Sequence, residues 1–184
     1  MKTLYVIACA APPARRLTIP IRAAQKSGWD VCLILTPDAH RWMTDDPEGN
    51  LDELRELTGH PVRHSYKLPS EPDVLPPPDA LLVAPLTSNS LNKWAAGISD
   101  TLALGLITEG IGKGLRIVAL PHWNDAQDRH PAVRRSVAEL REAGVTVLLD
   151  DGQGVPGYAP HPPGRGNLDA YPWELALDAL PPAS

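Results

Sequence analysis

The chain has 184 residues, of which 43% are hydrophobic and 21% are charged, so it can form one domain with a buried core. Its 17 Lys and Arg against 22 Asp and Glu give a formal net charge of -5, which argues against a general nucleic-acid binder. Two cysteines are too few for a disulfide framework, and no apolar run reaches the ~20 residues of a membrane span. We therefore expect a cytoplasmic protein with neither nucleic-acid nor membrane partners.

Short apolar runs alternate with longer stretches of helical periodicity along the chain. The expected strands are residues 4–8, 31–35, 80–84, 115–120 and 145–149. The expected helices are residues 14–27, 38–43, 51–57, 88–109, 126–143 and 173–180. Strands that are apolar throughout and joined by helices predict a single-domain α/β fold with a doubly wound parallel sheet, a Rossmann-like or flavodoxin-like three-layer sandwich.

In such sheets, ligands bind beyond the carboxyl ends of the strands. Two of the predicted ends are unusually polar, namely the segments Thr87–Ser90 and His122–Asn124. A helix N-cap explains one Ser or Thr, but not four polar side chains in a row. The sequence therefore predicts a functional site at these two strand ends.

The 21 prolines are about twice the usual proportion, and many of them lie in two loops. One loop spans residues 69–78, before the third strand, and the other spans residues 156–163, after the fifth. Because no second apolar core follows residue 150, we expect residues 1–150 to form the main domain. Residues 151–184 are expected to form a Pro/Gly-rich lid and C-terminal tail of the same domain.

Two glycine-rich motifs favour ordinary loops. The segment Gly152–Gly157 matches a dinucleotide fingerprint, but Pro156 prevents the helix that this fingerprint must open. The run Gly110–Gly114 resembles a phosphate-binding loop, yet Ile107 stands where the first glycine would be needed. We predict a turn at each position.

The histidines and cysteines give equally weak signals on their own. His60 and His64 flank Pro61 and lack a third ligand, so no metal site is expected. Cys9 ends a strand beside a helix start, where a reactive thiolate would be favoured. A small buried thiol is the preferred interpretation.

The stretch from Pro85 to Asp100 resembles the Pro-Ala-Ser-Ala-Asn-Thr motif of the homo-oligomeric flavin-containing cysteine decarboxylases. This family includes phosphopantothenoylcysteine decarboxylase and the epidermin-type peptidyl-cysteine decarboxylases. Its second motif, Pro-Ala-Met-Asn, has a counterpart in Pro121–Asn124, and the tail segment Pro163–Gly166 is also similar. The resemblance covers residues 1 to about 166.

The resemblance implies that FMN is the cofactor and that specific residues hold it. Residues expected near the FMN phosphate are Ala10, Ala11 and Thr36, and those expected to line the flavin are Thr87, Ser88, Asn89 and Trp123. Asn89 is also expected to reach the substrate carboxylate, and Asn124 to hold the substrate.

The resemblance further implies oxidative decarboxylation of a cysteine-like or peptidyl C-terminal cysteine to an enethiol. In this chemistry flavin takes a hydride from the cysteine side chain, and the resulting thioaldehyde loses CO2. Family members are trimers or dodecamers of trimers, so a homotrimer, or a dodecamer of trimers, acting on a thiol substrate is expected.

The chain also departs from the family pattern. The serine that binds phosphate is replaced by Ala11 or Pro12, and Glu71 occupies the position of the active-site histidine. His122 is the better-placed acid or base, whereas His64 reaches the site only if its loop folds over it. The lid cysteine of phosphopantothenoylcysteine decarboxylase is absent. These departures leave two alternatives: a flavoprotein with a different small-molecule redox role, or a non-catalytic flavin-binding subunit.

Overall fold

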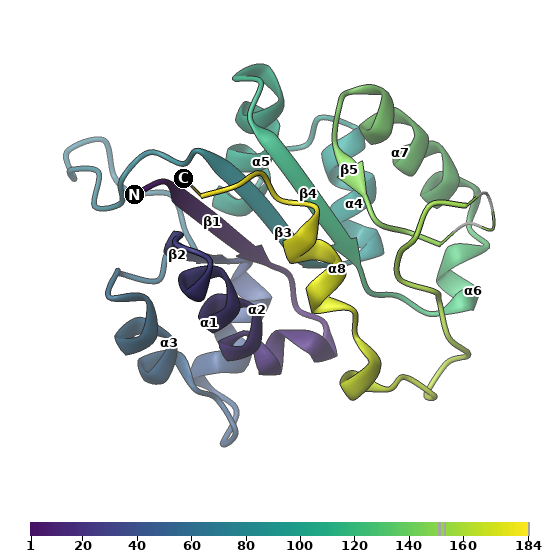
Figure 1. Ribbon diagram of the computed structural model, residues 1–184, viewed down its shortest axis with the longest axis horizontal. Coiled ribbons are helices and arrows are strands. Elements are labelled where there is room, and N and C mark those ends of the chain that lie inside the picture. Colours follow the sequence, from purple (N-terminus) through teal and green to yellow (C-terminus); the bar gives the residue numbers. More distant parts are fainter. Residues whose placement is uncertain (151, 153, 184) are drawn as a thin grey trace.

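The computed structural model describes residues 1–150, 152 and 154–183. Within these residues, five parallel strands form one sheet in the order β2-β1-β3-β4-β5 (Figure 1). The strands are β1 (Thr3–Ala8), β2 (Asp30–Leu35), β3 (Ala80–Leu86), β4 (Arg116–Pro121) and β5 (Thr146–Val147). The predicted doubly wound parallel sheet is therefore confirmed.

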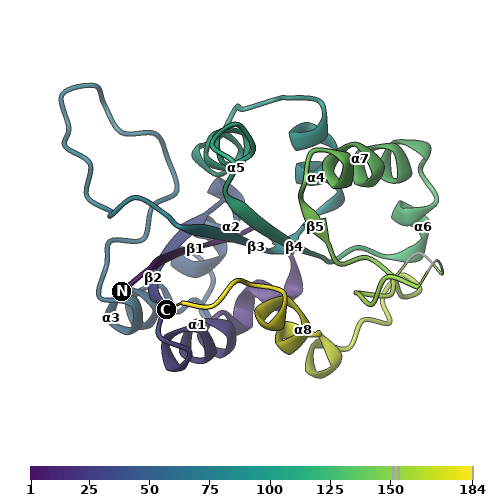
Figure 2. The same cartoon turned by 45° about the horizontal axis from the view of Figure 1, so that its top comes forward.

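Helices cover both faces of the sheet. They are α1 (Thr18–Lys26), α2 (Pro37–Thr44), α3 (Leu51–Thr58), α4 (Ser88–Ala95), α5 (Leu102–Gly112), α6 (Asp125–Asp128), α7 (Pro131–Glu142) and α8 (Trp173–Asp178). Figure 2 shows α1 and α8 side by side on one face and α4, α5 and α7 on the other. Among the described residues, no helix is both long and apolar enough to cross a membrane.

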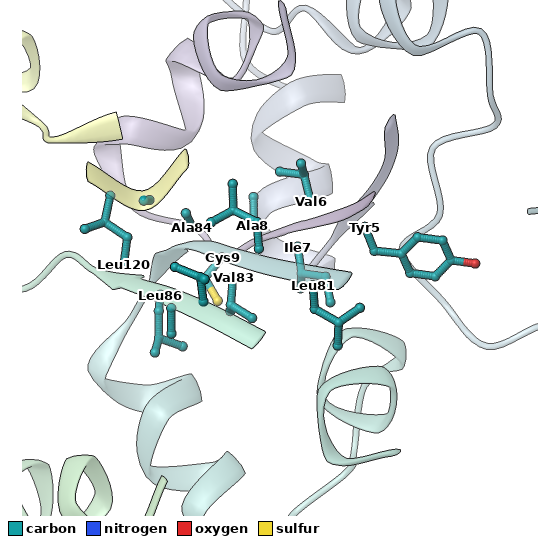
Figure 3. Packing of buried hydrophobic residues seen from close by; sticks show 14 of the residues in the cluster. Tyr5, Val6, Ile7, Ala8, Cys9, Leu81, Val83, Ala84, Leu86 and Leu120 are labelled. Carbon is teal, nitrogen blue, oxygen red and sulfur yellow. The ribbon is translucent and has the colours of Figure 1, made fainter. Parts of the chain in front are cut away.

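The core lies along the central strands, where β1 and β3 are buried at every position. Side chains from three strands meet there, including Ile7, Val83 and Leu120 (Figure 3). A strand buried on both faces needs apolar residues on both sides, which explains the continuous apolar runs in the sequence. Each fully buried Leu or Ile contributes about 1.5–3 kcal/mol to folding.

The predicted long helix over residues 88–109 was wrong, because the chain breaks it into α4 and α5. Gly97 adopts a left-handed conformation with φ of +73°, which ends the first helix. Ile98, in the turn that connects the two helices, is 44% exposed. Thr101 then caps the second helix, since its hydroxyl accepts the N–H of Leu104 at 3.2 Å.

The predicted helix over residues 126–143 was also wrong in its continuity. It is divided into α6 and α7, and Pro131 begins the second part. Proline fits the first turn of a helix because its missing N–H is not needed there. His130 supplies the cap, with its Nδ1 accepting the N–H of Ala132 at 3.1 Å. Likewise, only Thr146–Val147 of the predicted strand 145–149 pairs as a strand.

Candidate functional site at the carboxyl ends of the strands

The loop after β1 offers few hydrogen-bond donors. The N–H of Cys9 donates to the carbonyl of Pro85 at 3.0 Å, and that of Ala11 donates to the carbonyl of Cys9 at 2.9 Å. Pro12 and Pro13 have no N–H, although they open the 3-10 helix Pro12–Arg16. Ala10 is thus the one residue from 9 to 13 whose N–H is unpaired within the described chain.

The arginines that follow this loop are already paired. Arg15 forms an ion pair with Asp46 at 2.8 Å, and Arg16 pairs with Asp169 of the tail. Neither arginine is therefore a free cation for an anionic ligand at the end of β1.

Thr36 lies at the end of β2 and caps α2. Its hydroxyl accepts the N–H of Ala39 at 3.4 Å, and its own N–H donates to the carbonyl of Ala8 at 3.0 Å. The second bond holds the ends of β1 and β2 together. The structure thus brings Thr36 beside the loop of Ala10 and Ala11, as the sequence interpretation requires.

The start of α4 is the most polar part of this edge. Thr87 caps the helix, since its hydroxyl accepts the N–H of Ser90 at 3.3 Å. Ser88 is half-buried and Asn89 is exposed, and neither side chain forms a hydrogen bond within the described residues. Their backbone N–H groups lie in the first helical turn, where no intrahelical partner exists. This arrangement can bind an anion or the polar rim of a ring.

Cys9 lies beneath this helix start and is buried, with 3% of its surface exposed. Burial raises the pKa of the Cys9 thiol, although hydrogen bonds from Ser90 and Thr87 oppose the shift. The thiol form is therefore present at neutral pH, which confirms the interpretation of Cys9 as a small buried thiol.

Trp123 does not reach the open edge. Its side chain is 2% exposed, and its indole N–H donates to the Asp128 carboxylate of α6 at 2.9 Å. Asn124, the next residue, begins α6 with a reciprocal cap. Its Oδ1 accepts the N–H of Gln127 at 2.9 Å, and the Gln127 side chain accepts the N–H of Asn124 at 3.0 Å. The Asn124 amide NH2 group forms no hydrogen bond within the described residues.

His122 lies in an aromatic cluster built by the tail. Its ring centroid is 5.3 Å from Tyr158, 5.5 Å from His161 and 5.7 Å from Tyr171. Burial, with a smaller contribution from His161, lowers the pKa of His122 to about 4. The imidazole is thus neutral at pH 7, so it can accept a proton but has none to donate as an imidazolium.

The tail is fastened to the end of β4 by buried hydrogen bonds. The hydroxyl of Tyr158 donates to the carbonyl of Trp123, and that of Tyr171 donates to the carbonyl of Leu120, both at 2.8 Å. The backbone of His161 joins them, accepting the N–H of Asp125 at 2.9 Å. Sequence reasoning missed these residues. The signal that could have found them is the presence of two tyrosines in a segment rich in Pro and Gly. A buried tyrosine ring needs a hydrogen-bond partner for its hydroxyl, so such residues are expected to pack against the domain.

The two histidines before the third strand take different positions. His60 contacts the Asp30 carboxylate at 2.8 Å, whereas His64 stacks on His40 of α2 with ring centroids 3.6 Å apart. Glu71 lies in an exposed turn, where its carboxylate accepts the N–H of Leu68 at 2.7 Å. No group of three or more His, Cys, Asp or Glu among the described residues could hold a metal ion. In the segment Gly152–Gly157, Gln153 lies outside the described residues, as does Asp151 after β5.

The family model of the Flavoprotein family matches residues 17–165. A curated cysteine/cysteine sulfinic acid decarboxylase from an unknown prokaryotic organism is 29% identical over 102 residues. That match covers 55% of this chain and only 26% of the relative, about a quarter of the relative's length.

Solved structures share the fold over nearly the whole chain. The FMN-dependent cysteine decarboxylase TvaF from thioviridamide biosynthesis is 23% identical with a TM-score of 0.66, covering 97% of this chain and 98% of TvaF. The cypemycin decarboxylase CypD is 18% identical with a TM-score of 0.68, covering 97% of this chain and 91% of CypD. At these identities, the similarity establishes the three-layer α/β architecture.

Proposed function

The chain belongs to the Flavoprotein family, and on that premise we propose that it binds FMN and oxidatively decarboxylates a peptidyl C-terminal cysteine or a cysteine-like thiol to an enethiol. The names of the relatives support this proposal, since TvaF is an FMN-dependent cysteine decarboxylase and the curated relative is also a cysteine decarboxylase. The observation that carries it is the start of α4, where Thr87, Ser88 and Asn89 lie at the carboxyl edge of the sheet.

The residues of this edge fit the ring of a flavin. An isoalloxazine has a rim of alternating carbonyl and nitrogen atoms, which needs both donors and acceptors. The unpaired side chains of Ser88 and Asn89, together with the free N–H groups of the first turn of α4, provide both. Asn89 is exposed and Ser88 half-buried, so a ligand can reach these groups without disturbing the core.

The phosphate of FMN finds fewer partners. The N–H of Ala10 and the hydroxyl of Thr36 are the groups suited to hold it, and the two prolines remove donors that a helix start would otherwise supply. The site therefore fits FMN through its ring more strongly than through its phosphate.

Bound FMN would supply a two-electron acceptor for the hydride of the substrate CH2–SH group. The thiol proton leaves to a base, and the thioaldehyde so formed loses its carboxylate as CO2. The electron pair of the broken bond forms the Cα=Cβ double bond, and protonation of sulfur gives the enethiol. An external oxidant such as O2 must then take up the two electrons.

The chain's own residues have separate parts in this reaction. The free amide NH2 groups of Asn89 and Asn124 donate hydrogen bonds to the substrate carboxylate and orient it. The neutral ring of His122 accepts the thiol proton. Because a base with a pKa of about 4 is weak towards a thiol, proton removal accompanies hydride loss rather than preceding it. The tail tyrosines Tyr158 and Tyr171 exclude water from the ring of His122.

We also propose that the active protein is a cytoplasmic homotrimer or a dodecamer of trimers, following the family that its motifs resemble. Light scattering of the protein after size-exclusion chromatography measures this directly. A monomer in the presence of saturating FMN would contradict it.

The function is tested in two steps with the purified chain. Titration of FMN, followed by quenching of its fluorescence, should give saturable binding with one FMN per chain. The FMN-loaded protein should then release labelled CO2 from a peptide that ends in a carboxyl-labelled cysteine, in the presence of O2. Lack of FMN binding would overturn the whole proposal, and FMN binding without CO2 release would overturn the reaction alone.

A further inference from the structure

A cavity lies on the α5 face of the sheet, beside Tyr5 of β1 and Leu81 of β3. It has a volume of about 530 Å³ and is enclosed by α5, the start of β3 and the proline-rich loop before β3. Its apolar walls are formed by Ile34, Leu75, Leu81, Leu102, Leu106 and Leu115. This size and this lining are typical of sites for small, largely apolar molecules.

Tyr5 lines the cavity and shows which part of β1 it contacts. It belongs to the amino-terminal half of β1, and its buried ring extends away from the other labelled core side chains (Figure 3). Its hydroxyl donates to the carbonyl of Pro76 at 2.7 Å, which fastens the proline-rich loop to the sheet. On β1 the cavity is therefore lined by the amino-terminal half, whereas Ala10 and Ala11 follow the carboxyl end of this strand. On β2 the lining extends to Ile34, which pairs with Ile7.

Tyr66 closes one side of the cavity against a glycine of α5. A Cβ atom added at Gly105 would lie 2.1 Å from the Tyr66 hydroxyl oxygen, so no larger residue fits while the tyrosine keeps this place. Tyr66 is 56% exposed, and its hydroxyl donates to the carbonyl of Ser99 at 3.3 Å.

The charges around the cavity leave one cation without an anionic partner. Lys67 pairs with Asp73 at 3.4 Å, and Lys113 pairs with Glu109 at 2.8 Å. Arg63 forms no ion pair within the described part of the chain, and one of its guanidinium nitrogens donates to the carbonyl of Ser65 at 3.1 Å. Its other N–H groups remain available beside an apolar wall, and a guanidinium matches a carboxylate through two parallel hydrogen bonds.

We propose that this cavity binds a small amphipathic carboxylate, an aliphatic or aromatic acid whose carboxylate pairs with Arg63 and whose apolar part lies along α5. A single unpaired guanidinium balances one negative charge, which favours a carboxylate over a phosphate or a polyanion. The cavity shares no lining residue with the proposed FMN site, so we propose a ligand other than FMN.

The test uses octanoate as the probe and calorimetry on the full chain. Octanoate should bind saturably to the wild type, and Arg63→Gln should weaken binding by about tenfold or more, the loss expected for one charge-assisted pair. Lys113→Gln is the matched control because it removes a cation at the same cavity that already has a partner. It should change the affinity less than about threefold. Leu106→Trp, which fills the cavity, should abolish binding while circular dichroism shows a folded chain.

Three results would overturn the proposal. The first is the absence of saturable octanoate binding to the wild type. The second is an equal loss of octanoate affinity in Arg63→Gln and Lys113→Gln, which would show that only the net positive charge near the cavity matters. The third is a change of oligomeric state, seen by light scattering, in both Arg63→Gln and Leu106→Trp. That outcome would make the cavity a contact between copies of the chain instead of a ligand site.

Discussion

The candidate site has two sides that differ sharply in the groups they present. The β1–β2 side, formed by residues 9–13 and Thr36, has one unpaired loop N–H, a capping hydroxyl and two consecutive prolines. The β3–β4 side, formed by residues 87–90 and 122–124, has a polar helix start, a free amide group and a neutral imidazole. If the chain binds FMN as proposed, this contrast predicts that the flavin ring and the substrate are recognised mainly on the β3–β4 side and that the phosphate has fewer partners on the other.

The largest expected effect comes from reversing the polarity of Asn124. In Asn124→Asp, a carboxylate oxygen can still accept the N–H of Gln127 and keep the cap of α6, but the donor to the substrate is replaced by a negative charge. Turnover should fall about 100-fold with little change in Tm, because two carboxylates repel each other. Steady-state kinetics and a thermal scan measure the two quantities. Asn124→Ser, which keeps a cap without the charge, should lose less activity, and full activity in Asn124→Asp would contradict the assigned role.

The buried imidazole of His122 should make stability depend on pH. Its pKa of about 4 lies below the ordinary value of 6.5, so between these values the unfolded chain takes up a proton that the folded chain does not. The stability that comes from keeping His122 neutral in the folded chain is therefore fully present above about pH 6.5. It is lost as pH falls towards about 4.

His122→Phe keeps a ring among Tyr158 and Tyr171 and removes the titration. The drop in the free energy of unfolding between pH 7 and pH 4 should be smaller in this variant by about 1–2 kcal/mol, after allowance for partial exposure of the ring. Urea unfolding of both proteins at several pH values measures this change in the free energy of unfolding. Lowered pKa values of His40 and His64 act in the same direction in both proteins and cancel in the comparison. Identical pH profiles would show that His122 is not a buried neutral base.

Two threonines cap their helices with the same local geometry, so comparing their variants distinguishes an effect on helix stability from an effect on ligand binding. Thr87 and Thr101 each accept an N–H from the residue three positions on, at 3.3 Å and 3.2 Å. Thr87→Ala and Thr101→Ala should each cost about 1 kcal/mol of stability, since each removes one N-cap. Only Thr87→Ala should also weaken FMN binding, by about tenfold, in a fluorescence titration. Equal FMN affinities in the two variants would remove Thr87 from the flavin site.

The smallest effect should come from restoring a donor on the β1–β2 side. Pro12→Ser supplies an N–H and a hydroxyl at the start of the 3-10 helix, so FMN should bind a few-fold more tightly. Pro69→Ser, in the exposed proline-rich loop, is the control and should leave the FMN affinity unchanged. If Pro12→Ser leaves the affinity unchanged, the phosphate does not lie at this loop. The shortage of donors on the β1–β2 side would then have no effect on FMN binding.

Strand positions could be predicted well because buried parallel strands require continuous apolar runs, as in β1 and β3. The breaks within the predicted long helices could not be seen as easily. Gly97 sits within a stretch of good helical periodicity, and only its left-handed backbone shows that the helix ends there. The polar segment 87–90 could be recognised from composition alone, since four such side chains exceed what one helix cap requires.

The rest of the site depends on tertiary contacts that carry no local pattern. Trp123 is buried and its indole N–H donates to the Asp128 carboxylate, and a strand-end motif reveals neither feature. Tyr158 and Tyr171 come from a tail without periodicity, so their return to β4 could not be predicted. The low pKa of His122 arises from burial, with a smaller contribution from His161 of the tail. Sequence alone therefore suggests an acid or base but not its protonation state.

The most direct test of the central claim is the mass of the reaction product. Peptides ending in cysteine, incubated with the FMN-loaded protein in the presence of O2, should lose about 46 Da, one CO2 and two hydrogens. The loss should be absent when the C-terminal cysteine is replaced by serine. Unchanged masses across varied cysteine-ending peptides and free thiols, from protein that does bind FMN, would contradict the decarboxylase assignment.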